Sequence, residues 1–280
     1  MTLDRYAVLG NPVAHSRSPF IHAAFAQQTA QALVYERVRC EMGGFAATVR
    51  SFAAAGGRGC NVTVPFKFDA PALAARCSER ALLAGAANVL CLDGDDWFAD
   101  NTDGVGLVRD IEQGAGRALA GLRVLLVGAG GGAAGVLGPI IAARPAQVVL
   151  VNRSADKARA LVDRHAGWAR QHGVALPLAG IESPGEGFDL VLNATASSLQ
   201  GAPSPVPAST LARGALAVDL MYGPAAAPFL AWARAAGAEP RDGLGMLVEQ
   251  AAEAFALWRG VRPQTAPVLA ALSAEIAAGR

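Results

Sequence analysis

Short hydrophobic runs alternate with helical segments along the first hundred residues. Runs rich in valine, leucine and tyrosine predict strands over 6–10, 33–38, 60–64, 88–92 and 97–99. Helices are predicted between them, over 19–29 and 43–55. Strands that alternate with helices are typical of an α/β layer.

A second series of the same kind begins at Leu122. Its predicted strands cover 124–127, 148–151, 189–192 and 216–219, and its predicted helices follow Gly131 and cover 154–172 and 229–236. This order is typical of a doubly wound, Rossmann-type sheet. His165 shares an apolar helix face with Leu161 and Trp168, so we expect a half-buried face residue rather than a catalyst.

Two further helices are predicted near the C-terminus, from about Gly245 to Trp258 and from Pro263 to Ala278. The second series is complete before them, so we place them back on the first domain. The predicted domains are therefore 1–104 with 243–280, for the substrate, and 105–242, for a nucleotide. The chain would cross between the domains twice, leaving a cleft, which is the usual place for a ligand.

A glycine loop follows the first strand of the second series, where Val127 leads into Gly128-Ala129-Gly130-Gly131. A strand, a glycine loop and a helix together aim backbone N–H groups at a pyrophosphate. The pattern Gly128-x-Gly130-x-x-Ala133 fits the dinucleotide fingerprint, as does a register two residues later, and the strand end selects the first. A glycine-rich turn between a strand and a helix is the alternative.

Asn152-Arg153-Ser154 ends the next strand, where NAD-binding domains usually carry Asp or Glu for the ribose 2′-hydroxyl. Arg153 can instead fork onto a 2′-phosphate, and no carboxylate adjoins it. Each charge-assisted hydrogen bond is worth roughly 1.5–3 kcal/mol. The sequence therefore predicts NADP rather than NAD as the cofactor.

Composition and charge narrow the function. The chain has 280 residues, of which 52% are hydrophobic and 17% charged, so a disordered protein is excluded. The formal net charge is +1 without a long basic run, so we expect a small-molecule substrate and neither nucleic acid nor membrane as a partner. The N-terminus lacks an apolar export core, which favours the cytoplasm. Four scattered cysteines indicate neither a zinc site nor a redox motif.

Two segments of the first domain carry candidate chemistry. Ser16 and Ser18 lie two apart, so in an extended segment their hydroxyls face the same way and suit a carboxylate. An N-cap before Pro19 is the alternative for Ser18. In 60–67, the alternation directs Val62 and Val64 to a core and Asn61 and Thr63 to the opposite face. Lys67 then stands at the mouth of the sheet, with a solvated surface lysine as the alternative.

Two later residues join this set. Asp103, in Asn101-Thr102-Asp103-Gly104, is typical of a turn or of a cap on the helix that follows. Gln250 lies three residues after Leu247 and four before Ala254, on the apolar face of its helix. An inward amide needs a partner, which a ligand would supply, and a satisfied core glutamine is the alternative.

The order of the motifs resembles the shikimate dehydrogenase family from end to end. The motifs are Ser16-Arg-Ser-Pro19, Asn61-Val-Thr-Val-Pro-Phe-Lys67, Gly85-Ala-Ala-Asn88, Asn101-Thr-Asp-Gly104, the Gly128 loop, Asn152-Arg-Ser154, Asn193-Ala-Thr195, Asp219-Leu-Met-Tyr-Gly223 and Gly243-Leu-Gly-Met-Leu247. Each is weak to moderate alone, but their shared order is highly specific.

The resemblance implies NADP-linked reduction of 3-dehydroshikimate to shikimate, a step of aromatic amino acid (chorismate) biosynthesis, by a monomer or homodimer without a metal. Lys67 and Asp103 would be the catalytic pair, sharing one ligand oxygen at C3 in the gap between the domains. The substrate would be bound by Ser16, Ser18, Asn61, Thr63, Asn88, Asp103 and Gln250. The cofactor would be lined by Gly128, Ala129, Gly130, Gly131, Asn152, Arg153, Ser154, Asn193, Ala194, Thr195, Met221, Tyr222, Gly243 and Met246.

The chain departs from the usual family pattern at three places, none of them a proposed catalytic residue. Ala23 stands where Asn is common, Val89 where Thr is common, and Ala196-Ser-Ser follows Thr195. A quinate/shikimate dehydrogenase with broader substrate or NAD use is one alternative. Ser18 and Arg153 favour shikimate and NADP, although a methyl-sized difference shifts selectivity by only about 1–3 kcal/mol. A non-catalytic NADPH-binding sensor is the other, and intact Lys67 and Asp103 argue against it.

Overall fold

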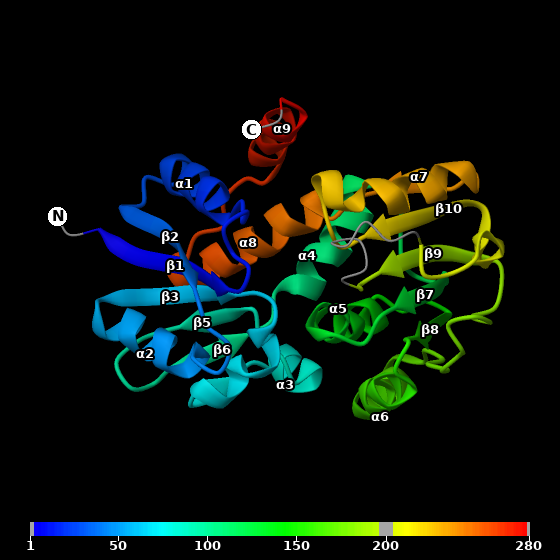
Figure 1. The fold of residues 1–280 in the computed structure, drawn as a ribbon, viewed down its shortest axis with the longest axis horizontal. Helices are drawn as coiled ribbons and strands as arrows, with labels where there is room; N and C mark the ends of the chain where they lie inside the picture. The colour runs from blue at the N-terminus through cyan, green and yellow to red at the C-terminus, as the bar shows by residue number, and fades with distance from the viewer. Residues whose placement is uncertain (1–2, 196–203, 279–280) are drawn as a thin grey trace. The chain divides into compact units, whose positions relative to one another are not determined.

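The computed structural model describes residues 3–195 and 204–278, which divide into two compact units (Figure 1). Unit 1 comprises the residues up to Gly106 and those from Leu247 onward, and unit 2 comprises Leu107–Met246. The two crossings fall inside helices α4 (Asp103–Arg109) and α8 (Leu244–Arg259). Because a helix continues through each crossing, the sequence carries no marker for the residue at which one unit ends.

Unit 1 is built on a mixed six-stranded sheet in the order β2-β1-β3-β5-β6-β4. β5 is antiparallel to both of its neighbours, and the other pairs are parallel. The strands are β1 (Asp4–Gly10), β2 (Leu33–Arg39), β3 (Gly57–Val62), β4 (Arg76–Cys77), β5 (Val89–Cys91) and β6 (Phe98–Asp100). The helices before α4 are α1 (Ser18–Gln28), α2 (Phe45–Ala54) and α3 (Glu79–Ala84), with 3-10 turns over Phe66–Phe68 and Ala70–Leu73.

The alternation of side chains along β1 explains the two cores of unit 1. Ala7 and Leu9 are fully buried in a cluster that includes Phe45 and Phe52 of α2. Tyr6 and Val8 point to the other face, where Tyr35 of β2 joins them. Hydrophobic clusters therefore cover both faces of the sheet at β1.

Unit 2 contains a five-stranded, fully parallel sheet in the order β11-β10-β9-β7-β8. The strands are β7 (Arg123–Val127), β8 (Gln147–Val151), β9 (Phe188–Asn193), β10 (Leu211–Asp219) and β11 (Glu239–Arg241). Helices α5 (Gly131–Ala142), α6 (Ala155–His172) and α7 (Ala227–Ala235) connect them. The last four residues of β7 are all fully buried, as expected of a parallel strand covered on both faces.

The C-terminal helices belong mainly to unit 1. α8 lies there from Leu247 onward, and α9 (Ala266–Ala277) contacts α1. Arg259, at the end of α8, donates to Asp4 Oδ2 at 2.5 Å and to Gln31 Oε1 at 2.8 Å. The predicted fold class, an α/β domain and a Rossmann-type domain with C-terminal helices returning to the first, is confirmed. Among the described residues, none of the helices is both long and apolar enough to traverse a bilayer.

Two expectations about side-chain burial are wrong. Val64 is 42% exposed rather than part of the core, because β3 ends at Val62 and the chain turns at Pro65, where Phe66 N donates to Thr63 O at 3.1 Å. His165 is fully buried rather than half-buried. Its Nδ1 lies 2.9 Å from Leu161 O, and burial lowers its pKa, which fits a core residue and not a catalyst.

His22 lies in the aromatic core above β1 and β2. It is 1% exposed, and its ring stacks on Tyr35 with centroids 4.2 Å and planes 2° apart. The rings of Phe25, Phe255 and Trp258 also surround it. Burial lowers the pKa of His22 from 6.5 to about 3, so the imidazole is neutral in the folded protein.

Acid should therefore destabilise the fold through His22. The stability that a neutral buried histidine contributes is complete above its unfolded pKa of 6.5 and is lost as the pH falls toward the folded value of about 3. Between pH 6.5 and 5 the expected loss is about 2 kcal/mol. Urea unfolding of His22→Gln should show a flatter pH dependence than the wild type, whereas His15→Gln, at an exposed position, should not. If the free energy of unfolding changes with pH equally in the wild type, His22→Gln and His15→Gln, His22 is not the group responsible.

Candidate functional site

The candidate residues of unit 1 gather at one edge of its sheet. β3 and β6 both end there, and the antiparallel β5 between them begins there. The register pairs Asn61 with Val89 and Val89 with Asp100. Asn61, Asn88 and Asp103 therefore come together at this edge although they are far apart in the sequence.

Lys67 reaches the same edge from the 3-10 turn that follows β3. Its Nζ donates to Asp103 Oδ2 at 2.5 Å, and the two side chains are 15% and 5% exposed. Lys67 is thus not a solvated surface lysine, and the Asp103 carboxylate is directed to Lys67 and Asn88 at the start of α4. Because both groups belong to unit 1, their pairing is independent of where unit 2 lies.

Asn88 is the centre of the hydrogen-bond network around Asp103. It is 2% exposed, and its Nδ2 lies within 3.0 Å of three acceptors, Asp103 Oδ1, Gln250 Oε1 and Thr102 Oγ1. Its Oδ1 accepts from Thr102 N at 2.8 Å. An amide NH₂ has two hydrogens for these three acceptors, and the Thr102 hydroxyl adds a third, which can reach Asn88 Oδ1 or Gln250 Oε1. Asn88 is therefore held in place by Thr102, Asp103 and Gln250.

Gln250 faces inward from α8, as its spacing predicts, and is 7% exposed. Its Nε2 donates to Leu247 O at 2.7 Å, while its Oε1 accepts from Asn88. Gly106 allows this arrangement, because a Cβ there would lie 2.6 Å from Gln250 N. Gln250 is partly satisfied within the protein, and its second Nε2 hydrogen has no acceptor among residues 3–195 and 204–278.

Ser16 and Ser18 present adjacent hydroxyls at the start of α1. Their Oγ atoms are 3.2 Å apart, and Ser18 N also donates to Ser16 Oγ at 3.3 Å. Ser18 does not cap α1, because the N-cap position is Arg17 and that cap has no side-chain hydrogen bond. Arg37 holds the loop by donating to Ser16 O through Nε and Nη2, at 2.9 and 2.6 Å.

Asn61 and Thr63 flank the end of β3. Asn61 is 6% exposed; its Oδ1 accepts from the Tyr35 hydroxyl at 2.6 Å, and its Nδ2 donates to Asn88 O at 3.2 Å. Thr63 is half-buried, and its backbone N donates to Leu9 O at 2.9 Å. Tyr35 is a member of this network that the sequence did not single out.

The candidate cofactor residues of unit 2 also lie at one sheet edge. Val127, Val151, Asn193 and Asp219 occupy matching register positions at the carboxyl ends of β7, β8, β9 and β10. The loops that follow these residues carry nearly all of the candidates. Parallel α/β sheets bind nucleotides at this edge.

The glycine loop has the backbone geometry of a phosphate cradle. Gly128 has φ +118°, a value that favours glycine, and a Cβ there would lie 3.0 Å from Ala194 O. Gly130 is the N-cap of α5, which has no side-chain cap, and a Cβ on Gly130 would meet no atom of residues 3–195 and 204–278 within 4 Å. The first N–H groups of α5 are therefore accessible to an anion, which fits a dinucleotide pyrophosphate.

The segment after β8 places an exposed cation next to a helix N-terminus. Asn152 Nδ2 donates to Ser154 O at 2.9 Å, and Ser154 is the N-cap of α6 without a side-chain cap. Arg153 is exposed and forms no hydrogen bond or ion pair with the part of the chain that the structure describes. These residues fit a phosphate group near the end of β8.

Two buried polar residues join the ends of β9 and β10. Asn193 Nδ2 donates to Asp219 Oδ2 at 3.1 Å, and Asn193 Oδ1 accepts from Thr195 Oγ1 at 2.7 Å. The backbone N of Ala194, just after β9, donates to Val127 O at the end of β7 at 2.8 Å. Ala196-Ser-Ser, the segment that departs from the family pattern, lies outside the described residues.

Gly243 allows the last candidate loop to approach β10. Met221 N donates to Asp219 Oδ1 at 2.9 Å, and Gly243 N donates to Met221 O at 2.8 Å. A Cβ on Gly243 would lie 2.3 Å from Leu220 O, so only glycine fits there without movement. Tyr222 is half-buried beside Met221, and Met246 is 7% exposed.

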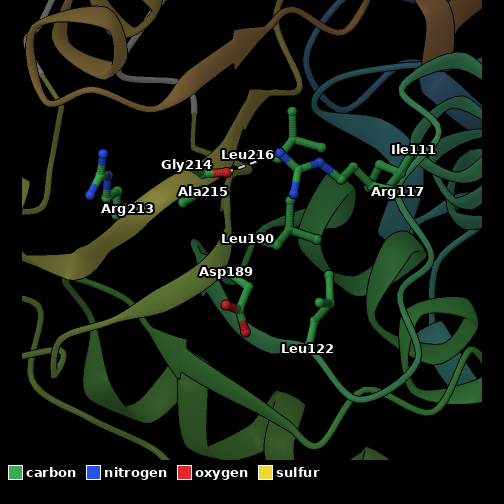
Figure 2. Close-up of a pocket in the computed structure, with 9 residues that line it drawn as sticks. All are labelled: Ile111, Arg117, Leu122, Asp189, Leu190, Arg213, Gly214, Ala215 and Leu216. Carbon is green, nitrogen blue, oxygen red and sulfur yellow. Dashed lines mark hydrogen bonds between the residues drawn. The ribbon is translucent and has the colours of Figure 1, made fainter.

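A pocket of about 100 Å³ lies at the opposite edge of the unit 2 sheet (Figure 2). Asp189 and Leu190 line it at the start of β9, and Arg117 donates across it to Gly214 O at 3.0 Å. Its volume is below the roughly 300–1,000 Å³ of sites for drug-sized ligands. This pocket is therefore separate from the candidate cofactor edge and too small for a nucleotide.

Three protein-family models match the chain. The shikimate dehydrogenase substrate binding domain matches residues 8–90, the shikimate/quinate 5-dehydrogenase model 110–203, and the shikimate 5′-dehydrogenase C-terminal domain 243–272. A shikimate dehydrogenase (NADP(+)) of Acidovorax ebreus (strain TPSY) is 62% identical over 276 residues, which cover 99% of this chain and 98% of the relative. This chain belongs to the shikimate dehydrogenase family.

Solved structures resemble both units of this shikimate dehydrogenase family member. An Ael1 enzyme from Pseudomonas putida has a TM-score of 0.86 and 47% identity, covering 96% of this chain and 98% of its own. Shikimate 5-dehydrogenase from Thermus thermophilus, in complex with NADP(H) and shikimate, has a TM-score of 0.84 and 32% identity, covering 96% and 98%. The resemblance therefore extends over both candidate edges.

Proposed function

We propose that this chain catalyses the reversible, NADP-dependent reduction of 3-dehydroshikimate to shikimate. The observation that carries the proposal is the Lys67–Asp103 pair, held at 2.5 Å at a sheet edge lined by polar side chains. The shikimate dehydrogenase (NADP(+)) relative and the Thermus thermophilus complex with NADP(H) and shikimate support this choice of substrate and cofactor.

The polar groups of unit 1 suit a ligand with one carboxylate and several hydroxyls. In our proposal the adjacent hydroxyls of Ser16 and Ser18 bind the carboxylate. The ring hydroxyls are bound by Asn61, Thr63, Asn88, Asp103 and Gln250. The support for this assignment is the network that joins Asn88 to Asp103 and Gln250, together with the unused Nε2 hydrogen of Gln250.

Lys67 is the proposed proton donor. NADPH supplies a hydride to the reacting carbon when it is bound, and the carbonyl oxygen must then gain a proton. The ammonium of Lys67 has three hydrogens, of which one is used by Asp103. Asp103 is held in turn through Oδ1 by Asn88 at 2.9 Å, so the ammonium is directed at one point. In the reverse direction, Lys67 takes the proton back from the substrate hydroxyl.

Unit 2 is the proposed NADP-binding domain. The loop Gly128-Ala129-Gly130-Gly131 and the N-terminus of α5 would hold the pyrophosphate, and Asn152-Arg153-Ser154 the 2′-phosphate. The nicotinamide end would lie near Asn193-Ala194-Thr195, Met221, Tyr222, Gly243 and Met246. The support for this assignment is the exposed side chain of Arg153 and the position of Gly130, where a Cβ would meet no atom within 4 Å in the described part of the chain.

Arg153→Ala should remove most of the preference for NADP. We expect kcat/KM for NADP to fall roughly 10- to 100-fold and that for NAD to stay nearly constant, because only NADP loses charge-assisted hydrogen bonds. Initial rates with each nucleotide at saturating shikimate measure the change. Arg159→Ala, at an exposed position of α6, the helix that follows Arg153, is the matched control. An equal fall for both nucleotides would show that Arg153 does not read the 2′-phosphate.

Initial rates with shikimate or quinate, each with NADP or NAD, test the proposed function. We expect the highest kcat/KM for shikimate with NADP. Comparable values for quinate would favour the broader quinate/shikimate dehydrogenase. NADPH binding without any cofactor reduction at alkaline pH would favour the non-catalytic sensor.

The proposed location is the cytoplasm, and the proposed assembly is a monomer or homodimer. All four cysteines are free thiols, which is typical of a reducing compartment. Light scattering coupled to gel filtration would measure the assembly state.

A further inference from the structure

We propose that Tyr35 is a positioning residue of the substrate site, acting through Asn61. This inference rests on the proposed function of Asn61. Tyr35 lies in β2 and is 8% exposed. β1 lies between β2 and β3, so the Tyr35 side chain reaches across β1 to Asn61.

The hydrogen bonds of Asn61 determine which way its amide points. Asn61 lies 3.2 Å from Asn88 O, a backbone carbonyl that can only accept, so Nδ2 and not Oδ1 must face it. Oδ1 therefore faces Tyr35, whose hydroxyl donates to it at 2.6 Å. The second Nδ2 hydrogen has no acceptor within the described ranges. Asn61 is thus fixed as a donor toward a ligand oxygen.

The position of the Tyr35 hydroxyl is fixed by packing of its ring. The His22 ring stacks flat on the Tyr35 ring, with the centroids 4.2 Å and the planes 2° apart. The centroids of the Tyr35 and Trp258 rings are 6.3 Å apart. A polar group held by a packed ring can set the geometry of the residues that it contacts. This is what a positioning residue requires.

Tyr35→Phe keeps the ring and its stack on His22 but removes the hydroxyl. Asn61 Oδ1 then loses its donor, and only the bond from Nδ2 to Asn88 O still holds the amide in place. We expect KM and the calorimetric Kd for shikimate to rise about tenfold, with kcat within about twofold and KM for NADP unchanged. Tyr6→Phe is the matched control, because Tyr6 is 3% exposed in the same cluster and its hydroxyl accepts from Arg259 Nη1 at 3.3 Å.

A double-mutant cycle with Asn61→Ala separates positioning from general damage. If Tyr35 acts through Asn61, adding Tyr35→Phe to Asn61→Ala should raise KM for shikimate by less than about twofold further. If the two substitutions raise KM for shikimate independently, so that their fold-changes multiply, the inference is overturned. It is also overturned if Tyr35→Phe changes KM for shikimate no more than Tyr6→Phe does. If the wild type binds shikimate but does not turn it over, only the proposed function is contradicted. The positioning role of Tyr35 can then still be tested, because the Kd for shikimate of each variant can be compared with that of the wild type. A wild type that does not bind shikimate would overturn both.

Discussion

Lys67→Met should lower kcat for shikimate oxidation with NADP by about 10²–10⁴ and leave KM for shikimate nearly unchanged, because general acid–base catalysis is lost. Methionine keeps an unbranched side chain in a place where Lys67 is only 15% exposed, so the packing is largely preserved. What disappears is the group that moves the proton. Initial rates in both directions, at saturating NADP or NADPH, measure the effect.

The control for this variant is Lys157→Met, at an exposed position of α6, which should keep its kcat. Thermal unfolding of both variants checks that the protein is folded, since removal of Lys67 leaves a buried carboxylate at Asp103 without its cation. A normal kcat combined with a raised KM would make Lys67 a binding residue and would reject its role as proton donor.

Lys67 and Asp103 show what the sequence can predict about a site and what it cannot. Taken alone, each has an ordinary structural interpretation, a surface lysine and a helix cap. The pairing depends on β5 running antiparallel between β3 and β6, which brings Lys67 and Asp103 to one edge. Local periodicity contains no information on that strand order. The order of the motifs along the chain supplied it indirectly, through the resemblance to a known family.

Tyr35 was missed for a related reason. The alternation along β2 predicts only that Tyr35 points inward. Its hydrogen bond to Asn61 depends on the order β2-β1-β3 and on a side chain long enough to reach across β1. The cofactor edge was easier to predict, because successive parallel strands of a doubly wound sheet all end on the same side, and the residues after each end are polar or glycine.

The elements of the fold that periodicity did not predict are short. β4 has two residues, β11 three and α3 six, too few for an apolar repeat to be recognised. Signals for α3 were nevertheless present. Ser78 caps its N-terminus by accepting from Ala81 N at 3.1 Å, and Gly85 ends it with φ +62°. Capping residues would therefore have located a helix that hydrophobic pattern alone cannot show.

Asp103→Asn should lower kcat by about 10²–10⁴, as for Lys67, because it removes the carboxylate that directs the ammonium. The asparagine has no good orientation at this position. If its oxygen faces Asn88 Nδ2, its NH₂ meets Lys67 Nζ, and if it is reversed, its NH₂ meets Asn88 Nδ2. Two donors face each other in either case, so Lys67 should move away from the ligand oxygen.

A second buried carboxylate distinguishes this effect from general damage. Asp110 has a side chain 2% exposed and accepts from Arg241 Nε and Nη2 at 2.8 and 2.6 Å, wholly within unit 2. Asp110→Asn should lower the free energy of unfolding, because a buried ion pair is broken, yet the folded protein should keep its kcat. Equal losses of kcat in both variants would mean that Asp103 acts only on stability. A loss of kcat in Asp103→Asn but not in Asp110→Asn would show that the reaction needs the negative charge of Asp103 beside Lys67.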